Sequence, residues 1–260
     1  MAERYIVPLD LGDSSSDKSL FYLRRGFGEI ERNKRIAVYV GNAKKKIVVD
    51  AGAPDLERCL KYHTISRTEP LRPEQGIVAQ LGKIGVKPEE IDIVVLTHLH
   101  WDHVGNVTKF PNAQFIVSSE EMRIALNPPP CLYSAYEALQ LGMQPEFLKV
   151  IDRIKTVEMK EREIVEGVRL IPLPGHTPGT IGVIVETEKG PYVIAGDAVP
   201  KYGTLRGSPE EGLPYLMSGI YTDMIAMWKS FELIDEIVEH DFSRVIPGHD
   251  LLVFQKDKYP

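Results

Sequence analysis

The segment His98–His103, which reads His-Leu-His-Trp-Asp-His, restricts what this chain can fold into more than any other feature. It follows directly on residues 91–97, an almost continuous apolar run that predicts a buried strand. Side chains four residues apart share one face of a helix, but these imidazoles and the carboxylate stand at i, i+2, i+4 and i+5. The sequence therefore predicts a strand that ends in a tight loop, from which several polar side chains converge.

Three further residues stand alone in the sequence but in the same local setting. His176 follows Pro174-Gly175, Asp197 follows Gly196 and His249 follows Gly248, each just after a predicted strand. Loops at strand ends are where functional residues gather. One such histidine would usually be structural, but the agreement of residue type, loop context and density predicts a metal site. Imidazole and carboxylate ligands suit zinc, and iron, manganese or cobalt would also accept them.

The rest of the chain alternates short apolar runs with helical patterns, which predicts a layered α/β fold in one domain over residues 1–260. Strands are predicted at residues 36–40, 46–50, 91–97, 114–117, 168–173, 181–185, 192–195 and 244–246. Helices are predicted after Pro73, after Ser118, where Ser118 and Glu121 form a capping-box pattern, and over residues 224–238. The segments 127–163 and 200–221 break this rhythm, and we expect them to flank the functional site.

Charge and composition limit the classes of partner that we expect this chain to bind. The formal net charge is −6 and no basic stripe is present, which argues against a nucleic-acid surface. No apolar stretch reaches the length of a membrane span, so no membrane partner is expected. Cys59 and Cys131 lack the spacing of a metal motif, and we expect two free thiols in a cytoplasmic protein.

The order of these motifs resembles that of the metallo-β-lactamase superfamily, and Asp50-Ala51-Gly52 resembles its early Asp-x-Gly motif. The resemblance covers about residues 36 to 250. It implies an αββα sandwich with a dinuclear metal site at the sheet edge, and Asp50 as a residue that orients the ligand loop. The implied ligands are His98, His100 and His176 for one ion, Asp102, His103 and His249 for the other, and Asp197 as the bridge.

Two such ions, about 3.5–4 Å apart, would share a hydroxide and position it for attack, which predicts hydrolysis. Asp102 would take the proton from this nucleophile and return it to the leaving group. Within the superfamily the chain most resembles the N-acyl homoserine lactonase-like group, which implies that it opens a lactone or cleaves a related carboxylic ester. True β-lactamases usually lack an aspartate at the position of Asp197, so a β-lactam is not the expected substrate.

One position departs from the lactonase pattern. Those enzymes usually carry a substrate-binding tyrosine three residues after the bridging aspartate, where this chain has Pro200. Tyr202 and Tyr221 are therefore candidates for a catalytic hydroxyl. Apolar residues of the two irregular segments, Leu132 and Tyr133 among them, predict either a partly apolar pocket or the contact of a homodimer.

Other activities on the same fold stay open as alternatives. One is a thioesterase of the glyoxalase II type, and another is a persulfide dioxygenase with a single iron held by two histidines and an aspartate. Metal content separates the second from a hydrolase, because the dioxygenase needs one iron and the hydrolase two redox-silent ions. A non-catalytic binding protein is disfavoured, because all seven ligand positions carry ligand-type residues.

Overall fold

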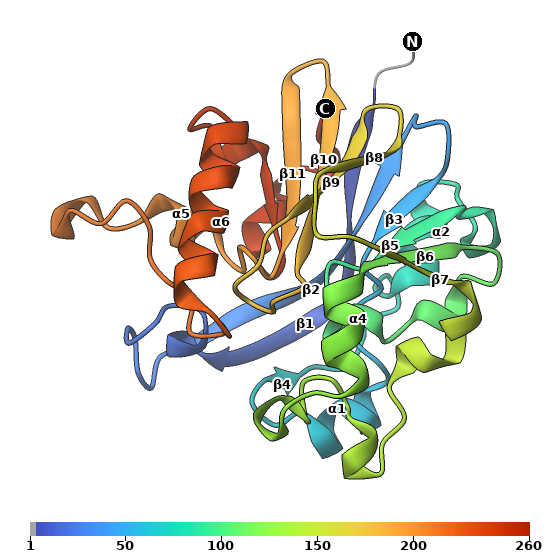
Figure 1. Cartoon of the computed structure of the whole chain (residues 1–260), viewed down its shortest axis with the longest axis horizontal. Helices are drawn as coiled ribbons and strands as arrows, with labels where there is room; N and C mark the ends of the chain where they lie inside the picture. The colour runs from blue at the N-terminus through green and yellow to red at the C-terminus, as the bar shows by residue number, and fades with distance from the viewer. Residues whose placement is uncertain (1–3) are drawn as a thin grey trace.

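The computed structural model describes residues 4–260, in which two β-sheets pack face to face (Figure 1). The larger sheet has seven strands in the order β4-β1-β2-β3-β5-β6-β7. They are β1 (Tyr5–Asp17), β2 (Ile30–Gly41), β3 (Ile47–Val49), β4 (Arg67–Thr68), β5 (Ile93–Val95), β6 (Gln114–Ser118) and β7 (Ile154–Val157). The smaller sheet has the order β12-β11-β10-β9-β8. Its strands are β8 (Arg162–Val165), β9 (Val168–Pro172), β10 (Ile181–Thr187), β11 (Gly190–Gly196) and β12 (Val245–Pro247).

Six α-helices lie among the described residues, and the longest of them covers the outer face of the smaller sheet (Figure 1). They are α1 (Leu56–Tyr62), α2 (Ile77–Lys83), α3 (Trp101–Val104), α4 (Ser119–Leu126), α5 (Tyr202–Arg206) and α6 (Met224–Ile237). Side-chain caps fix several of the starts: Asp223 accepts hydrogen bonds from the backbone N–H groups of Ile225 and Ala226 at the start of α6.

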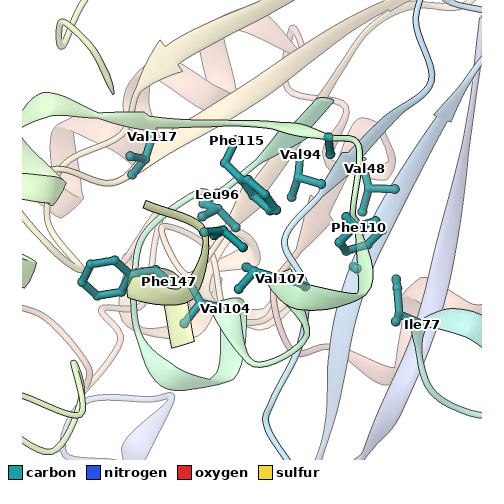
Figure 2. Close-up of a cluster of buried hydrophobic side chains, with 14 of the residues drawn as sticks. Val48, Ile77, Val94, Leu96, Val104, Val107, Phe110, Phe115, Val117 and Phe147 are labelled. Atoms are coloured by element: carbon teal, nitrogen blue, oxygen red, sulfur yellow. The ribbon is translucent and has the colours of Figure 1, made fainter. Parts of the chain in front are cut away.

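Three apolar cores separate the layers, and the alternation of side chains along the strands explains them. On β3, Val48 faces the helices α2 and α4, whereas Ile47 and Val49 face the second sheet. Figure 2 shows part of the core on the helical side, where Phe115 packs near Val94 and Phe110. The third core lies between the smaller sheet and α6. These layers confirm the αββα sandwich that the resemblance implied.

The direction of the strands places the functional loops. Strands β3, β5, β6 and β7 run parallel to one another in the larger sheet, and β11 runs parallel to β12 in the smaller one. The carboxyl ends of parallel strands meet at one edge of a sheet. The loops that follow β5, β11 and β12 carry predicted ligands, so each sheet delivers such residues from one edge.

Each predicted strand corresponds to a strand of the structure, but the sequence missed four others. Strand β1 went unnoticed because its second half, Gly12–Asp17, is polar and resembles a loop. Its carboxylates are paired across the sheet: Lys34 contacts Asp10 at 2.7 Å and Asp13 at 2.8 Å. Short β4 and the edge strands β7 and β8 were missed as well.

The segment 127–163 is irregular only in its first part. Its first part is a series of short 3₁₀ turns, but residues 154–157 join the larger sheet as β7 and residue 162 begins β8. One of these 3₁₀ turns spans Glu146–Arg153. Among residues 4–260, no helix is long and apolar enough to span a membrane.

Candidate metal centre

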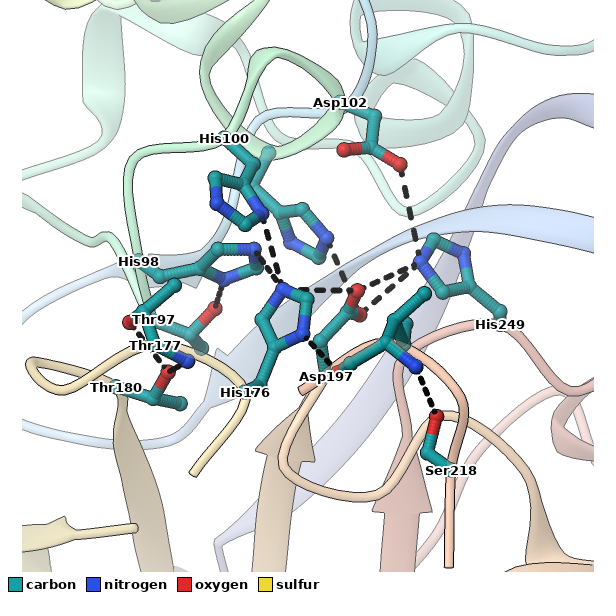
Figure 3. A network of polar contacts seen from close by, with 12 residues as sticks. Thr97, His98, His100, Asp102, His176, Thr177, Thr180, Asp197, Ser218 and His249 are labelled. Carbon is teal, nitrogen blue, oxygen red and sulfur yellow. Dashed lines mark hydrogen bonds and ion pairs between the residues drawn. The ribbon is translucent and has the colours of Figure 1, made fainter. Parts of the chain in front are cut away.

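Four loops and one short helix bring the seven predicted ligand residues into one cluster (Figure 3). His98 and His100 lie in the loop after β5, and Asp102 and His103 lie on the short helix α3 that follows. His176 lies between β9 and β10, Asp197 follows β11, and His249 follows β12. Leu99 points into the apolar core, and this strand-like alternation turns the two histidines beside it the other way.

The first set of side chains is the three-histidine group, formed by His98, His100 and His176. The Nε2 atom of His176 lies 3.2 Å from Nε2 of His98 and 3.0 Å from Nδ1 of His100. All three side chains are buried. Three ring nitrogens directed at one another from three sides form an arrangement that can hold one metal ion.

The second set is the aspartate group, formed by Asp102, His103 and His249. Its ligand atoms lie within 4.8 Å of one another, with Nε2 of His249 at 3.8 Å from Oδ2 of Asp102. Asp197 lies between the two sets. Its Oδ1 is 3.2 Å from Nε2 of His103 and 3.0 Å from Nε2 of His249, and its Oδ2 is 3.6 Å from Nε2 of His176.

The outward nitrogens of the histidines are held by fixed acceptors. Nδ1 of His176 lies 2.8 Å from the carbonyl of Ile220, and Nδ1 of His249 lies 2.8 Å from the carbonyl of Lys34. A carbonyl can only accept, so each Nδ1 carries the proton and each Nε2 presents a lone pair to the cluster.

Asp50 fixes two more of these rings. Its Oδ2 lies 2.8 Å from Nδ1 of His103 and accepts the hydroxyl of Thr97 at 2.8 Å. Since the Thr97 hydroxyl donates to Asp50, it accepts from Nδ1 of His98, 3.0 Å away. Asp50 thus orients one histidine of each set.

Two buried atoms at the centre of the cluster fit a metal ion. Nε2 of His103 and Oδ1 of Asp197 are buried and have no hydrogen-bond partner. Such atoms are costly in a protein interior unless an ion or water satisfies them. The close approach also leaves no room for a side chain at Gly248, where a Cβ would lie 2.4 Å from Oδ1 of Asp197.

The electrostatics of the two sets differ. Burial, followed by the neighbouring imidazoles, lowers the pKa of His98 and His100 well below the usual histidine range, so both rings are neutral. Burial acts against a charge on His103 as well, but Asp197 and Asp50 outweigh it and raise the pKa of that ring. Neutral imidazoles are the form that binds metals.

The sequence matches the profile of the metallo-beta-lactamase superfamily over residues 36–249. The chain belongs to the metallo-β-lactamase superfamily. It is 31% identical over 183 residues to an N-acyl homoserine lactonase of a Bacillus species. The aligned part is 68% of this chain and 63% of that relative, so less than two thirds of the relative is covered.

Solved structures of two lactonases share the fold. One is an N-acyl homoserine lactone hydrolase with the product N-hexanoyl-L-homoserine bound at its catalytic metal centre. It has a TM-score of 0.74 and 22% identity, and the match covers 97% of this chain and 95% of that one. The other is AidC, a dizinc quorum-quenching lactonase in complex with a product, with a TM-score of 0.70, 17% identity, and coverage of 96% and 88%.

Arg35 is a residue of this superfamily member that the sequence did not single out. It lies on β2, is 3% exposed, and its Nη1 donates to Oδ2 of Asp102 at 2.8 Å. Its guanidinium also stands 4.8 Å from the centre of the Trp101 ring. Burial opposes ionisation of Asp102, but Arg35 together with His103 and His249 outweighs it and lowers the pKa of that carboxyl to about 2. Arg35 lies just before an apolar run, and nothing local marks it.

A cavity of about 390 Å³ opens beside the cluster. Its floor includes His100, Asp102, His176, Asp197 and His249, and Arg35 forms part of its side. Apolar residues from separate segments form much of the remaining wall: Leu20, Phe21, Ile65, Leu132, Ala135 and Ile220. Tyr221 also lines this cavity, and 39% of its surface is exposed. Both irregular segments therefore contribute to the wall.

The structure corrects the expectation for Tyr202. Its side chain is buried in the core between the two sheets, and its hydroxyl donates to the carbonyl of Val245 at 2.8 Å. It does not line the cavity. Asp250 accepts the backbone N–H of Tyr202 at the start of α5, and this fixes the side chain toward the core. Tyr202 is therefore not a catalytic candidate.

Proposed function

We propose that this chain is a metal-dependent hydrolase that opens a lactone or cleaves a related carboxylic ester, with N-acyl homoserine lactones as the first substrates to test. The observation that carries the proposal is the placement of Asp197 between two ligand sets, beside a cavity with an apolar wall. The similarity to N-acyl homoserine lactonases supports the substrate class.

In this proposal the three-histidine group would hold one Zn²⁺ ion and the aspartate group a second, with Asp197 available to both sets. The unpartnered atoms of His103 and Asp197 support this assignment. A pair of such ions supplies an activated nucleophile at neutral pH and polarises the carbonyl that it attacks. The dizinc lactonase that shares the fold supports zinc as the first metal to test.

The protein residues then have separate tasks. Arg35 and His249 both approach Oδ2 of Asp102. We therefore assign to Oδ1 of Asp102 the transfer of a proton to the leaving oxygen. The apolar wall, with Leu132 and Ile220, binds the aliphatic part of the substrate and excludes water. Tyr221 is the tyrosine among the residues that line this cavity, and we assign to its hydroxyl a contact with the substrate.

The test is hydrolysis of a lactone series and a matched thioester series by zinc-loaded protein, with chelator-stripped protein as the control. Zinc-dependent lactone opening that varies with acyl length is the expected result. Cleavage of thioesters alone would replace the lactonase by a thioesterase. Elemental analysis runs in parallel, because one iron per chain without hydrolysis would replace it by the mononuclear dioxygenase.

Two further expectations from the sequence stay proposals. A cytoplasmic location is supported by Cys59 and Cys131, which are both free thiols. A homodimer is supported by apolar side chains that remain exposed near the cavity, such as Ile65 at 68%. Light scattering of the purified protein decides the second, because a mass of one chain at micromolar concentration would exclude a stable dimer.

A further inference from the structure

The side chain of Glu121 does not do what its sequence pattern predicts. Glu121 stands at the third position of α4, and its backbone N–H donates to the Ser118 hydroxyl at 3.0 Å, as in a capping box. In a complete box, the glutamate side chain would return to the backbone of Ser118. Here the carboxyl group instead points into the protein interior, where Glu121 is 0% exposed.

Its two oxygens accept hydrogen bonds from three separate segments. Oε1 accepts the backbone N–H of Leu99 at 2.9 Å and the hydroxyl of Tyr136 at 2.9 Å. Oε2 accepts the hydroxyl of Thr177 at 2.5 Å. Thr177 is further held by Thr180, whose hydroxyl is 2.7 Å away (Figure 3).

Each of these donors adjoins the three-histidine group. Leu99 is the residue between His98 and His100, and Thr177 directly follows His176. The ring of Tyr136 meets the ring of His100 edge to face, with centroids 4.7 Å apart. One carboxylate therefore contacts a neighbour of every histidine in the group, although it touches none of the three.

The backbone around Glu121 is equally close to the histidine loop. A Cβ at Gly179 would lie 2.2 Å from the backbone nitrogen of Glu121, so the loop that carries His176 rests directly on the first turn of α4. The Ser118 hydroxyl donates to the carbonyl of Gly179 at 2.6 Å. The start of α4 is thus attached both to the loop after β9 and to the loop after β5.

Burying a carboxyl group costs free energy of folding. Its charged form loses hydration, and burial raises the pKa of Glu121, although hydrogen bonds from Thr177 and Leu99 act against this. Apolar residues of similar size would fill the same space without that cost. A carboxyl group has a property they lack, because its two oxygens can fix two loops at a set separation.

We propose that Glu121 is a positioning residue that sets the relative placement of His98, His100 and His176, and so the metal affinity and geometry of the three-histidine group. This inference rests on the proposed metal-binding role of that group. It goes beyond the ligands themselves and assigns the function of a residue that lies outside the cavity.

The experiment compares Glu121→Gln with Glu120→Gln. Gln keeps the shape and one acceptor oxygen, but its amide NH₂ cannot accept the Thr177 hydroxyl. Glu120 is the adjacent residue, pairs with Arg123 at the surface, and serves as the matched control. Zinc affinity is measured by competition with a chelator, and the visible spectrum of the cobalt-loaded protein reports ligand geometry.

Glu121→Gln is expected to weaken one of two zinc-binding steps by about 10- to 100-fold and to change the cobalt spectrum, as loss of a partner that orients ligands does. Glu120→Gln is expected to change neither. Wild-type affinity and spectrum in Glu121→Gln would overturn the inference and leave the metal site standing. Wild-type protein that binds no zinc would instead overturn the proposed function.

Two milder variants keep the test decisive if Glu121→Gln does not fold. Thr177→Val removes one hydrogen bond to the carboxylate, whereas Thr177→Ser retains the hydroxyl. The inference expects weaker zinc binding and an altered cobalt spectrum in the valine variant, with both restored in the serine variant. Equal zinc binding and equal spectra in the two variants would count against it.

Discussion

The two ligand sets of the candidate metal centre are held by different kinds of interaction. The three-histidine group consists of neutral rings that are held by backbone carbonyls, by hydroxyl groups and, at one remove, by Glu121. The aspartate group is held by charge, because Arg35 contacts Asp102 and Asp50 contacts His103. We infer that neutral partners hold the three-histidine group in a geometry ready for a metal ion. In the aspartate group, Asp102 also pairs with the positive charge of Arg35.

The largest expected effect comes from Asp197, which lies between the two sets. Asp197→Ala is expected to remove at least one zinc ion and to lower the hydrolysis rate by roughly 1000-fold or more, because even residues that only orient ligands are worth 10- to 100-fold. Elemental analysis and kcat measure the two outcomes. Asp152→Ala, at an exposed position, is the control. Two retained ions with normal turnover would remove Asp197 from the site.

Arg35→Gln tests whether the aspartate group depends on charge. Removing one partner of a buried ion pair leaves the other uncompensated, which is expected to cost about 3 kcal/mol of unfolding free energy in chelator-treated protein. Added zinc is expected to restore most of this loss, because a cation then faces Asp102 again. Urea unfolding with and without zinc measures both. Arg32→Gln, exposed on the same strand, is expected to be neutral, and an equal loss in that control would contradict the explanation.

Asp50→Asn tests how far each set depends on Asp50, which contacts His103 directly and reaches His98 only through Thr97. Asparagine retains one acceptor oxygen but loses the charge next to His103, so zinc binding is expected to weaken by about 10- to 100-fold. If the comparison holds, Asp50→Asn changes the spectrum of cobalt at the aspartate group more than the spectrum of cobalt at the three-histidine group, which is the set that Glu121→Gln affects. Identical spectral changes in the Asp50 and Glu121 variants would mean that the two sets form one unit.

The smallest effect is expected at Tyr202, which lies in the core and not in the cavity. Tyr202→Phe removes the hydrogen bond to Val245 and is expected to cost about 1 kcal/mol of stability with no change in kcat or KM. Tyr221→Phe, measured alongside, is the contrasting variant, because Tyr221 lines the cavity. A rate loss in Tyr202→Phe would contradict its placement.

The sequence predicted the residues of the cluster because each has a local signal: His176, Asp197 and His249 follow a strand and a glycine, and the other four form a dense motif directly after a buried strand. Arg35 and Glu121 lack such a signal, because their roles depend on partners 67 and 56 residues away, Asp102 and Thr177. Tyr202 failed for a related reason. Its distance from Asp197 in the chain was known, but not the direction in which α5 turns its side chain.

The same limit applies to the fold. Apolar strands such as β5 were predictable from composition, whereas the polar half of β1 is held by its pairing with β2 and by contacts such as that of Lys34 with Asp13. Pairing across a sheet supplied the stability that local propensity lacked. Partners distant in the sequence therefore account for the polar half of β1 in the fold and for Arg35 and Glu121 in the site.

Much of the apolar wall of the cavity comes from segments that carry none of the seven candidate ligands. Leu20, Ile65, Leu132 and Ile220 come from four separate stretches of the chain, and Ile220 holds His176 only through its backbone carbonyl. A gene library randomised at these four positions would diversify what the protein accepts while the ligand side chains stay intact. Mutations that change the wall and mutations that change the ligand side chains therefore fall at different positions, so selection can act on substrate range without altering the chemistry.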